Sequence, residues 1–140
     1  MTDSALTTRL GVSRRVRVLS ADDNPLIGSF LREVLHDHFD VIANVENAAD
    51  VPEYIQQDKP DVIVLDVSFG PTCGIALAAK LRKIGFCGKI VFLTVHQEKD
   101  FIAAAFAAGA SAYVFKARMH SDLIPAIDAA LRGGTFISQN

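Results

Sequence analysis

The sequence predicts an α/β fold in which a parallel sheet of five strands is covered on both faces by five helices. Three observations lead to this prediction. From Val16 onward, apolar runs of about five residues alternate with amphipathic stretches of roughly a dozen, which is the pattern of repeated βα units. The apolar runs are compact and rich in β-branched residues, as strands buried on both faces are. Glycines follow three of the amphipathic stretches, where helices commonly end.

The strands are expected at the apolar runs. Each run is short, and the stretch between two runs is long enough to cross back over the sheet as a helix. The five expected strands span residues 16–20, 41–45, 62–66, 89–94 and 111–115.

The first helix is expected to begin at Pro25, with Asn24 as its N-cap and the proline in the first turn, where its missing N–H costs least. One face of this helix carries apolar residues at helical spacing and is expected to lie in the core. Its members are Leu26, Ile27, Phe30, Leu31, Val34 and Leu35.

The remaining helices are bounded by proline and glycine. The second is expected from about 48 to 57, with Pro52 limiting where it can start. The third runs from 74 to 84 and the fourth covers 101–109, each closing on a glycine. The last is expected to start near Ser121 or Asp122, with Pro125 in its first turn, and to stop at Gly133 and Gly134.

Size and composition favour one domain, spanning 16–138, after an amino-terminal tail over 1–15 that is expected to be flexible. Half of the 140 residues are hydrophobic and the formal net charge is −2, which excludes a broadly disordered chain and leaves no basic surface for nucleic acid. Cys73 and Cys87 lie far apart without histidines at metal-ligand spacing, so a reducing, cytoplasmic setting is expected. No apolar run approaches membrane-spanning length, and none at the amino terminus is typical of a secretory signal.

Polar residues follow four of the predicted strands. They are Asp22 and Asp23 after the first strand, Asp66 at the end of the third, Thr94 at the end of the fourth and Lys116 after the fifth. Each alone has an ordinary alternative: a turn-forming acid, a loop acid, a β-branched strand residue or a solvated lysine. Because the carboxyl ends of parallel strands share one edge of the sheet, all five are expected to meet there.

Three neighbouring carboxylates repel one another unless a cation neutralises them. Oxygen ligands without histidine or thiolate favour Mg²⁺. An aspartate can act as a covalent nucleophile in phosphoryl transfer, with Lys116 and the metal offsetting phosphoryl charge and Thr94 donating a hydrogen bond. The combination therefore predicts a phosphoryl-accepting site.

Sequence motifs around these residues resemble those of the response regulator receiver family of bacterial two-component systems, over 16–138. Gly74 also follows Asp66 at the family's usual distance. The motifs are SADDNPLI, KPDVIVLD, LTVH and AAGASAYVFK.

The resemblance implies a three-layer, doubly wound sheet in the flavodoxin-like order 2-1-3-4-5. It implies that Asp66 is the phosphorylation site, and that Mg²⁺ is held by Asp23, Asp66 and the backbone carbonyl of Ser68, with Asp22 binding through water. Thr94 and Tyr113 become a switch pair that remodels the face made by the fourth helix, fifth strand and fifth helix, the 4-5-5 face. His96, two places after Thr94, is expected beside the site.

Two departures from the family pattern stand out. After Asp66 the usual apolar residue and proline are replaced by Phe69, Gly70 and Pro71, which alters the loop beside the site. Lys116 is followed by Ala117 instead of proline, so no cis bond is expected there. The second departure and the ending AIDAALRGGTFIS resemble the NarL/FixJ (LuxR-type) subgroup, whose receivers precede a DNA-binding output domain; within these 140 residues no output domain is expected.

The function that these features predict is a switch more than an enzyme. A histidine kinase would phosphorylate Asp66, and the 4-5-5 face would then change and could form a homodimer. DNA would be reached only through the output domain. The altered loop keeps open a second hypothesis, a receiver-like interaction module that works without phosphorylation. A metal-dependent phosphatase is disfavoured, because no second general acid accompanies Asp66 in its loop.

Overall fold

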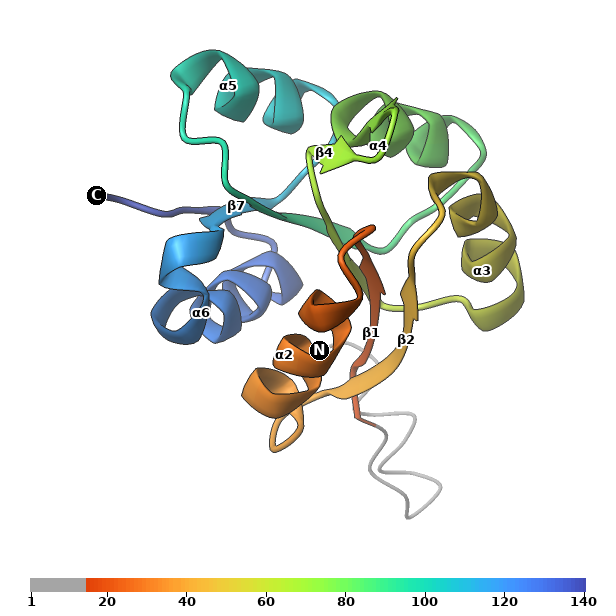
Figure 1. Ribbon diagram of the computed structural model, residues 1–140, viewed down its shortest axis with the longest axis horizontal. Helices are drawn as coiled ribbons and strands as arrows, with labels where there is room; N and C mark the ends of the chain where they lie inside the picture. The colour runs from red at the N-terminus through yellow and green to blue at the C-terminus, as the bar shows by residue number, and fades with distance from the viewer. Residues whose placement is uncertain (1–14) are drawn as a thin grey trace.

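The computed structural model describes residues 15–140, so the tail expected over 1–15 lies, except for Arg15, outside the described residues. Its centre is a parallel sheet flanked by two helical layers (Figure 1). The strand order is β2-β1-β3-β6-β7-β8, and the first five confirm the predicted flavodoxin-like order. The strands are β1 (Arg17–Ala21), β2 (Asp40–Val45), β3 (Val62–Leu65), β6 (Lys89–Thr94), β7 (Ala112–Phe115) and β8 (Phe136–Ile137).

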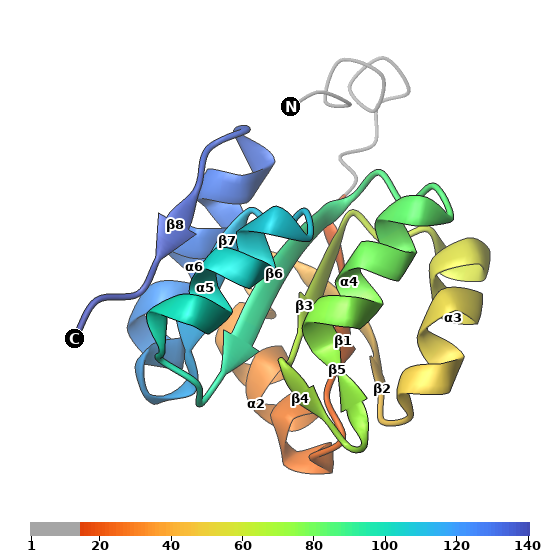
Figure 2. The same ribbon diagram turned by 90° about the horizontal axis from the view of Figure 1, so that it is seen from above.

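Two helices cover one face of the sheet and three cover the other (Figures 1 and 2). The first pair is α2 (Pro25–Leu35) and α6 (Met119–Leu131). The opposite layer holds α3 (Val51–Asp58), α4 (Gly74–Lys83) and α5 (Lys99–Ala107). Two short 3₁₀ turns, η1 (Ala48–Asp50) and η2 (Lys116–Arg118), lead into α3 and α6.

Successive strand residues point alternately into the two helical layers. In β6, for example, Phe92 packs toward α3, α4 and α5, whereas Val91 and Leu93 pack toward α2 and α6. Because both faces are buried, both sets of positions must be apolar. This explains why the strands read as continuous apolar runs in the sequence.

The apolar face predicted for the first helix is wider than the one that the helix buries. Asn24 caps α2 as expected, and its side chain accepts a hydrogen bond from the amide of Leu26. Ile27, Leu31 and Leu35 are buried, but the side chains of Leu26 and Phe30 are 61% and 43% exposed, so the prediction that they lie in the core was wrong. Leu26 and Phe30 each precede a buried position by one residue, which turns them about 100° away from the sheet.

The last helix begins earlier than predicted. The turn η2 runs directly into α6, whose first residue is Met119, so Pro125 lies inside the helix and not in its first turn. Met119 is buried in the core with Leu123 and Ile127, and its burial favours this early start. Pro125 lies on the exposed face, where water can satisfy the carbonyl that its missing N–H leaves free.

Three short strands were not predicted. β8 adds a sixth strand to the edge of β7, with Ala112 opposite Phe136 and Tyr113 opposite Ile137. β4 (Ser68–Phe69) and β5 (Thr72–Cys73) form an antiparallel hairpin after β3, at the end of the sheet where α2 starts (Figure 2). Each has only two residues, too few for a period-2 pattern to show.

The loop after Asp66 passes against the start of α4 so closely that only glycine fits at position 74. A Cβ on Gly74 would lie 1.8 Å from the backbone carbonyl oxygen of Asp66, and the Gly74 amide donates to the Val67 carbonyl at 2.6 Å. The glycine therefore fixes the path of the chain beside Asp66.

Replacing Gly74 by alanine forces this loop and the helix apart. We expect Gly74→Ala to lower the free energy of unfolding by about 3 kcal/mol, measured by urea denaturation. Gly134→Ala is the matched control, because its Cβ would meet its nearest atom at 3.4 Å. It is expected to stay within about 0.5 kcal/mol of wild type. Equal stability of the two variants would contradict the tight packing at Gly74.

Candidate functional site

Polar side chains from separate loops meet at the carboxyl edge of the sheet. Asp22 and Asp23 directly follow β1, Asp66 directly follows β3, and Lys116 directly follows β7. Asp22, Asp23 and Asp66 each offer a carboxylate oxygen, and these three oxygens lie within 4.8 Å of one another. Asp22 and Asp66 are buried, whereas Asp23 is exposed. The cluster therefore opens to solvent on the side of Asp23.

The Lys116 ammonium bridges the two buried carboxylates. Its Nζ lies 2.9 Å from Asp22 Oδ2 and 3.0 Å from Asp66 Oδ2. The other oxygen of each carboxylate accepts a backbone hydrogen bond, Asp22 Oδ1 from the Asn24 amide at 2.9 Å and Asp66 Oδ1 from the Ser68 amide at 3.1 Å. Lysine from β7 thus joins the loops after β1 and β3.

Burial and charge oppose each other in this cluster. Burial raises the pKa of Asp22 above its usual range, although the Asn24 amide and Lys116 lower it in part. Burial lowers the pKa of Lys116, but hydrogen bonds from its ammonium to Asp22 and Asp66 outweigh this, and the pKa is raised. When all three carboxylates are ionised, one ammonium leaves two negative charges in excess. This all-oxygen, negatively charged set fits a hard divalent cation.

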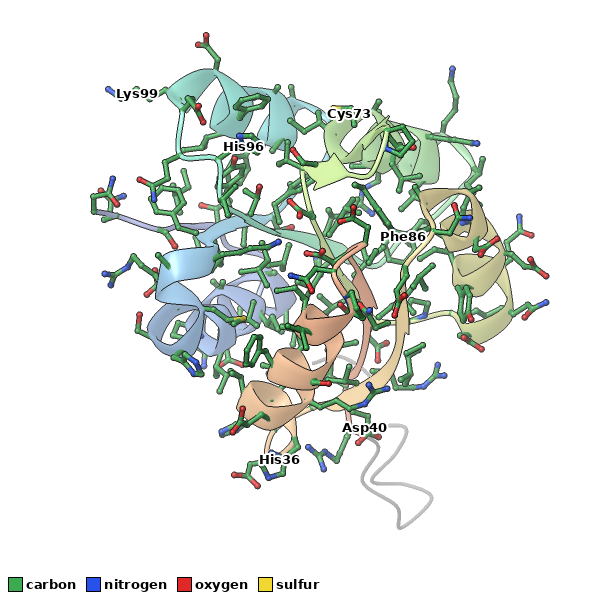
Figure 3. The ribbon with its side chains drawn as sticks, viewed as in Figure 1. His36, Asp40, Cys73, Phe86, His96 and Lys99 are labelled. Carbon is green, nitrogen blue, oxygen red and sulfur yellow. The ribbon has the colours of Figure 1, made fainter. Side chains whose placement is uncertain are left out.

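Ser68 and His96 form a side-chain hydrogen bond beside the site. Ser68 Oγ and His96 Nε2 are 2.7 Å apart, which joins the loop after β3 to the loop after β6. The His96 ring also packs on Phe101 of α5, with centroids 4.7 Å apart. In Figure 3, His96 lies on the inner side of α5, whereas Lys99 at the start of that helix points outward. The sequence placed His96 beside the site but gave no sign of this contact.

Thr94 and Tyr113, the expected switch pair, are both fully buried and both contact His96. Thr94 ends β6, and its hydroxyl accepts a hydrogen bond from the His96 amide at 3.4 Å. The Tyr113 hydroxyl donates to the His96 carbonyl at 2.8 Å. Burial raises the pKa of the Tyr113 hydroxyl, which keeps it protonated as a donor. The Tyr113 side chain therefore points inward in this structure.

The residues near Ser68 form the unusual loop noted in the sequence. Phe69 is buried, Gly70 adopts a left-handed φ of 58°, and Pro71 follows it in the turn between β4 and β5. Gly70 suits this conformation because it has no Cβ. The altered loop is thus a hairpin in which the Ser68 amide donates a hydrogen bond to the Asp66 carboxylate.

Two other expectations concern the chain as a whole. Both cysteines, Cys73 and Cys87, are free and exposed. Across residues 15–140, every helix is too short or too polar to cross a membrane.

Comparison with known proteins gives one consistent family. A family model described as the response regulator receiver domain matches residues 18–128. The chain is 34% identical over 121 residues to the uncharacterized transcriptional regulatory protein YxjL of Bacillus subtilis, covering 85% of this chain and 56% of that protein. It is 30% identical over 128 residues to a nitrate/nitrite response regulator protein homolog of Haemophilus influenzae, covering 90% of this chain and 62% of that one.

Solved structures agree with the sequence relatives. The crystal structure of a LuxR-family two-component response regulator from Aurantimonas superposes with a TM-score of 0.83 at 28% identity, covering 89% of this chain and 91% of that chain. The chain spans little more than half the length of the curated relatives it matches, 56% and 62% of the two proteins named.

Removing the lysine exposes the repulsion within the cluster. We expect Lys116→Met to lower the free energy of unfolding by about 2 kcal/mol at neutral pH, because two buried carboxylates lose a charged partner. Burial raises the pKa of Asp22 in the folded state, so the free energy of unfolding falls as pH rises from the ordinary value of 3.8 through the raised pKa. The deficit of Lys116→Met should therefore shrink in acid.

Urea denaturation from neutral pH down to the range where carboxylates protonate measures this effect. The matched control is Lys83→Met in the last turn of α4, where the lysine is exposed and a change within about 0.5 kcal/mol is expected at every pH. A deficit for Lys116→Met that stays constant with pH would contradict the charge argument.

Proposed function

The chain belongs to the response regulator receiver family of two-component signalling, in its NarL/LuxR-type branch, and we propose that a histidine kinase phosphorylates it on Asp66. One observation carries the proposal. Asp66 is a buried carboxylate held on Lys116 next to two further acids, at the one edge of the sheet where all these loops meet. A loop acid without these neighbours would have no means to stabilise a transferring phosphoryl group.

The proposed reaction is a direct displacement at phosphorus. A carboxylate oxygen of Asp66 forms a bond to the phosphorus of a phosphohistidine, the P–N bond breaks, and the kinase histidine leaves with that electron pair. The Lys116 ammonium, already on Asp66 Oδ2, would move onto a phosphoryl oxygen and offset its charge. The protein thus contributes positioning and electrostatics, and hydrolysis of its own acyl phosphate later resets it.

Mg²⁺ is the cofactor that we propose for this site. When bound, it supplies positive charge to the acids and to the phosphoryl oxygens. Asp23 and Asp66 would ligate it directly with the backbone carbonyl of Ser68, and Asp22 would bind through water. The support is the all-oxygen donor set and its excess negative charge.

The proposed output is a change in the 4-5-5 face, which here consists of α5, β7 and α6. Thr94 would turn its hydroxyl toward a phosphoryl oxygen, and the Tyr113 ring would move to the inward position behind it, the position that it has in this structure with its hydroxyl on the His96 carbonyl. This face could then form a homodimer and act on a DNA-binding output domain outside this chain. Both related proteins carry names of transcriptional or nitrate/nitrite response regulators, which supports such an output. Two free, exposed thiols favour the cytoplasm as its setting.

Phosphorylation can be measured by mass spectrometry with acetyl phosphate as a small donor. We expect wild type to gain one phosphoryl group in the presence of Mg²⁺ and none after chelation, because the acids need a cation to admit a phosphate. Asp66→Asn should gain no phosphoryl group, and Asp23→Asn should gain far less than wild type. Asp37→Asn is the control, because Asp37 is an exposed surface acid, and its labelling should equal that of wild type.

The same samples test the second hypothesis, a receiver-like module that works without phosphorylation, which the hairpin of Phe69, Gly70 and Pro71 motivates. That hypothesis would be favoured if wild type is not labelled and if its dimer has the same affinity with and without donor, measured by analytical ultracentrifugation. Labelling at Asp66 with donor-dependent dimerisation would favour the first.

The exposed pair on α2 gives the kinase a place to bind. Leu26 and Phe30 lie 61% and 43% exposed on the helix that starts directly after Asp22 and Asp23. A kinase histidine that reaches Asp66 must cover this end of the sheet, and two neighbouring apolar side chains suit the centre of such an interface.

We therefore expect Leu26→Ser and Phe30→Ser to slow transfer from a histidine kinase about tenfold each, the loss typical of one apolar contact in an interface. Labelling by acetyl phosphate should be unchanged, because the site itself is intact. Ile84→Ser is the control: Ile84 is 43% exposed but follows the carboxyl end of α4, whereas the amino end of that helix, at Gly74, is the one that lies against Asp66. Equal slowing with both donors would place the effect in the site and not in docking.

A further inference from the structure

A third buried carboxylate lies in α6, six residues after Lys116 in the chain. Asp122, in α6, is only 7% exposed and accepts four hydrogen bonds from three side chains. Its Oδ2 accepts from Arg118 Nε at 2.9 Å and from Ser138 Oγ at 2.7 Å, and its Oδ1 accepts from Ser121 Oγ at 2.9 Å. Burial raises the pKa of Asp122, but the hydrogen bonds from Arg118, Ser138 and Ser121 outweigh it, so the pKa is lowered and the group is ionised.

Ser138 connects this carboxylate to the strand that carries the switch tyrosine. It follows β8 and is 3% exposed. Its amide donates to the Tyr113 carbonyl at 2.9 Å, and its hydroxyl oxygen accepts from the Phe115 amide at 3.1 Å. The same hydroxyl donates its proton to Asp122. The end of β7 is thus tied to α6 through one serine.

These contacts bracket Lys116. Phe115, just before the lysine, is held by Ser138, and Arg118, two places after it, is held directly by Asp122. The turn η2 between them has no side-chain cap of its own, and no cis peptide bond occurs in the described residues. Ala117 supplies none of the backbone restriction that a proline would. The buried network therefore supplies the restraint.

We propose that Ser138 and Asp122 are positioning residues for phosphoryl transfer. They hold the chain on both sides of Lys116, through the Phe115 amide and the Arg118 side chain, so that the ammonium lies between Asp22 and Asp66. The inference rests on the function proposed above. Lysine has a flexible four-carbon stem, so the position of its backbone decides where the ammonium can reach. A displacement of about 1 Å at such a group can cost on the order of a hundredfold in rate.

Labelling by acetyl phosphate in Mg²⁺ tests this inference. Ser138→Ala and Asp122→Asn should slow labelling of Asp66 roughly tenfold or more. Ser138→Thr, which keeps the hydroxyl, should recover most of the rate. Gln139→Ala is the matched control from the same segment: the Gln139 side chain is exposed, and within residues 15–140 its hydrogen bond is to the carbonyl of Ile137, so the rate of this variant should equal wild type.

A double-mutant cycle separates positioning from general loss of structure. If Ser138 acts through Lys116, adding Ser138→Ala to Lys116→Met should slow labelling no further. An equal fold-loss from Ser138→Ala in both backgrounds, or an unchanged rate in the single variant, would overturn the proposal.

A measurement without any phosphodonor keeps this result distinct from the proposed function. In wild type the ammonium hydrogens of Lys116 should exchange slowly with water, because they are donated to two carboxylates, so its ¹⁵Nζ resonance should be sharp. This resonance should broaden or shift in Ser138→Ala but not in Gln139→Ala. If wild type is never labelled but its Lys116 resonance depends on Ser138, the phosphorylation proposal is contradicted and the positioning role is supported. If the resonance does not change in Ser138→Ala, the positioning role is contradicted even when Asp66 is labelled.

Discussion

The ion pairs of Lys116 with Asp22 and Asp66 are the interaction on which the rest of this site depends. A parallel sheet brings the loops after β1, β3 and β7 to one edge, and with them three carboxylates that repel one another. The lysine neutralises only part of that charge. The remaining excess makes the site suited to a cation and a phosphoryl group, and the lysine is the group that can change partners when they arrive.

A connected set of contacts leads from this edge toward the opposite side of β7. Ser68, on the Asp66 loop, meets the His96 side chain, while the His96 backbone contacts Thr94 and Tyr113. Tyr113 in turn lies opposite Ile137 of β8. Ser138 follows β8 and donates a hydrogen bond to Asp122. The structure thus offers a continuous physical route from the proposed phosphorylation site to α6 and β8 through hydrogen bonds, and to α5 through the packing of the His96 ring on Phe101.

Most of the fold could be predicted because long periodic segments depend on local rules. The cap at Asn24, the strand runs and the helix-ending Gly85 and Gly109 follow from backbone conformation and burial. The errors lie where tertiary contacts override those rules. Leu26 and Phe30 fit an apolar helical face, but the sheet below α2 covers a narrower stripe. Burial of Met119 draws the start of α6 back from Ser121 or Asp122 to Met119, which leaves Pro125 beyond the first turn. β8 exists only because the edge of β7 is there to pair with.

The sequence by itself determined the fold class, the family and the five polar residues at strand ends, because strand order and strand direction place those ends together. The tertiary structure alone decided which oxygens Lys116 contacts, that His96 reaches Ser68, and that Ser138 donates to Asp122. These contacts join residues from 16 to 94 positions apart in the chain, the farthest being Lys116 and Asp22. No local pattern encodes such contacts, since a side chain at a strand end can turn toward any of several neighbours and packing selects one.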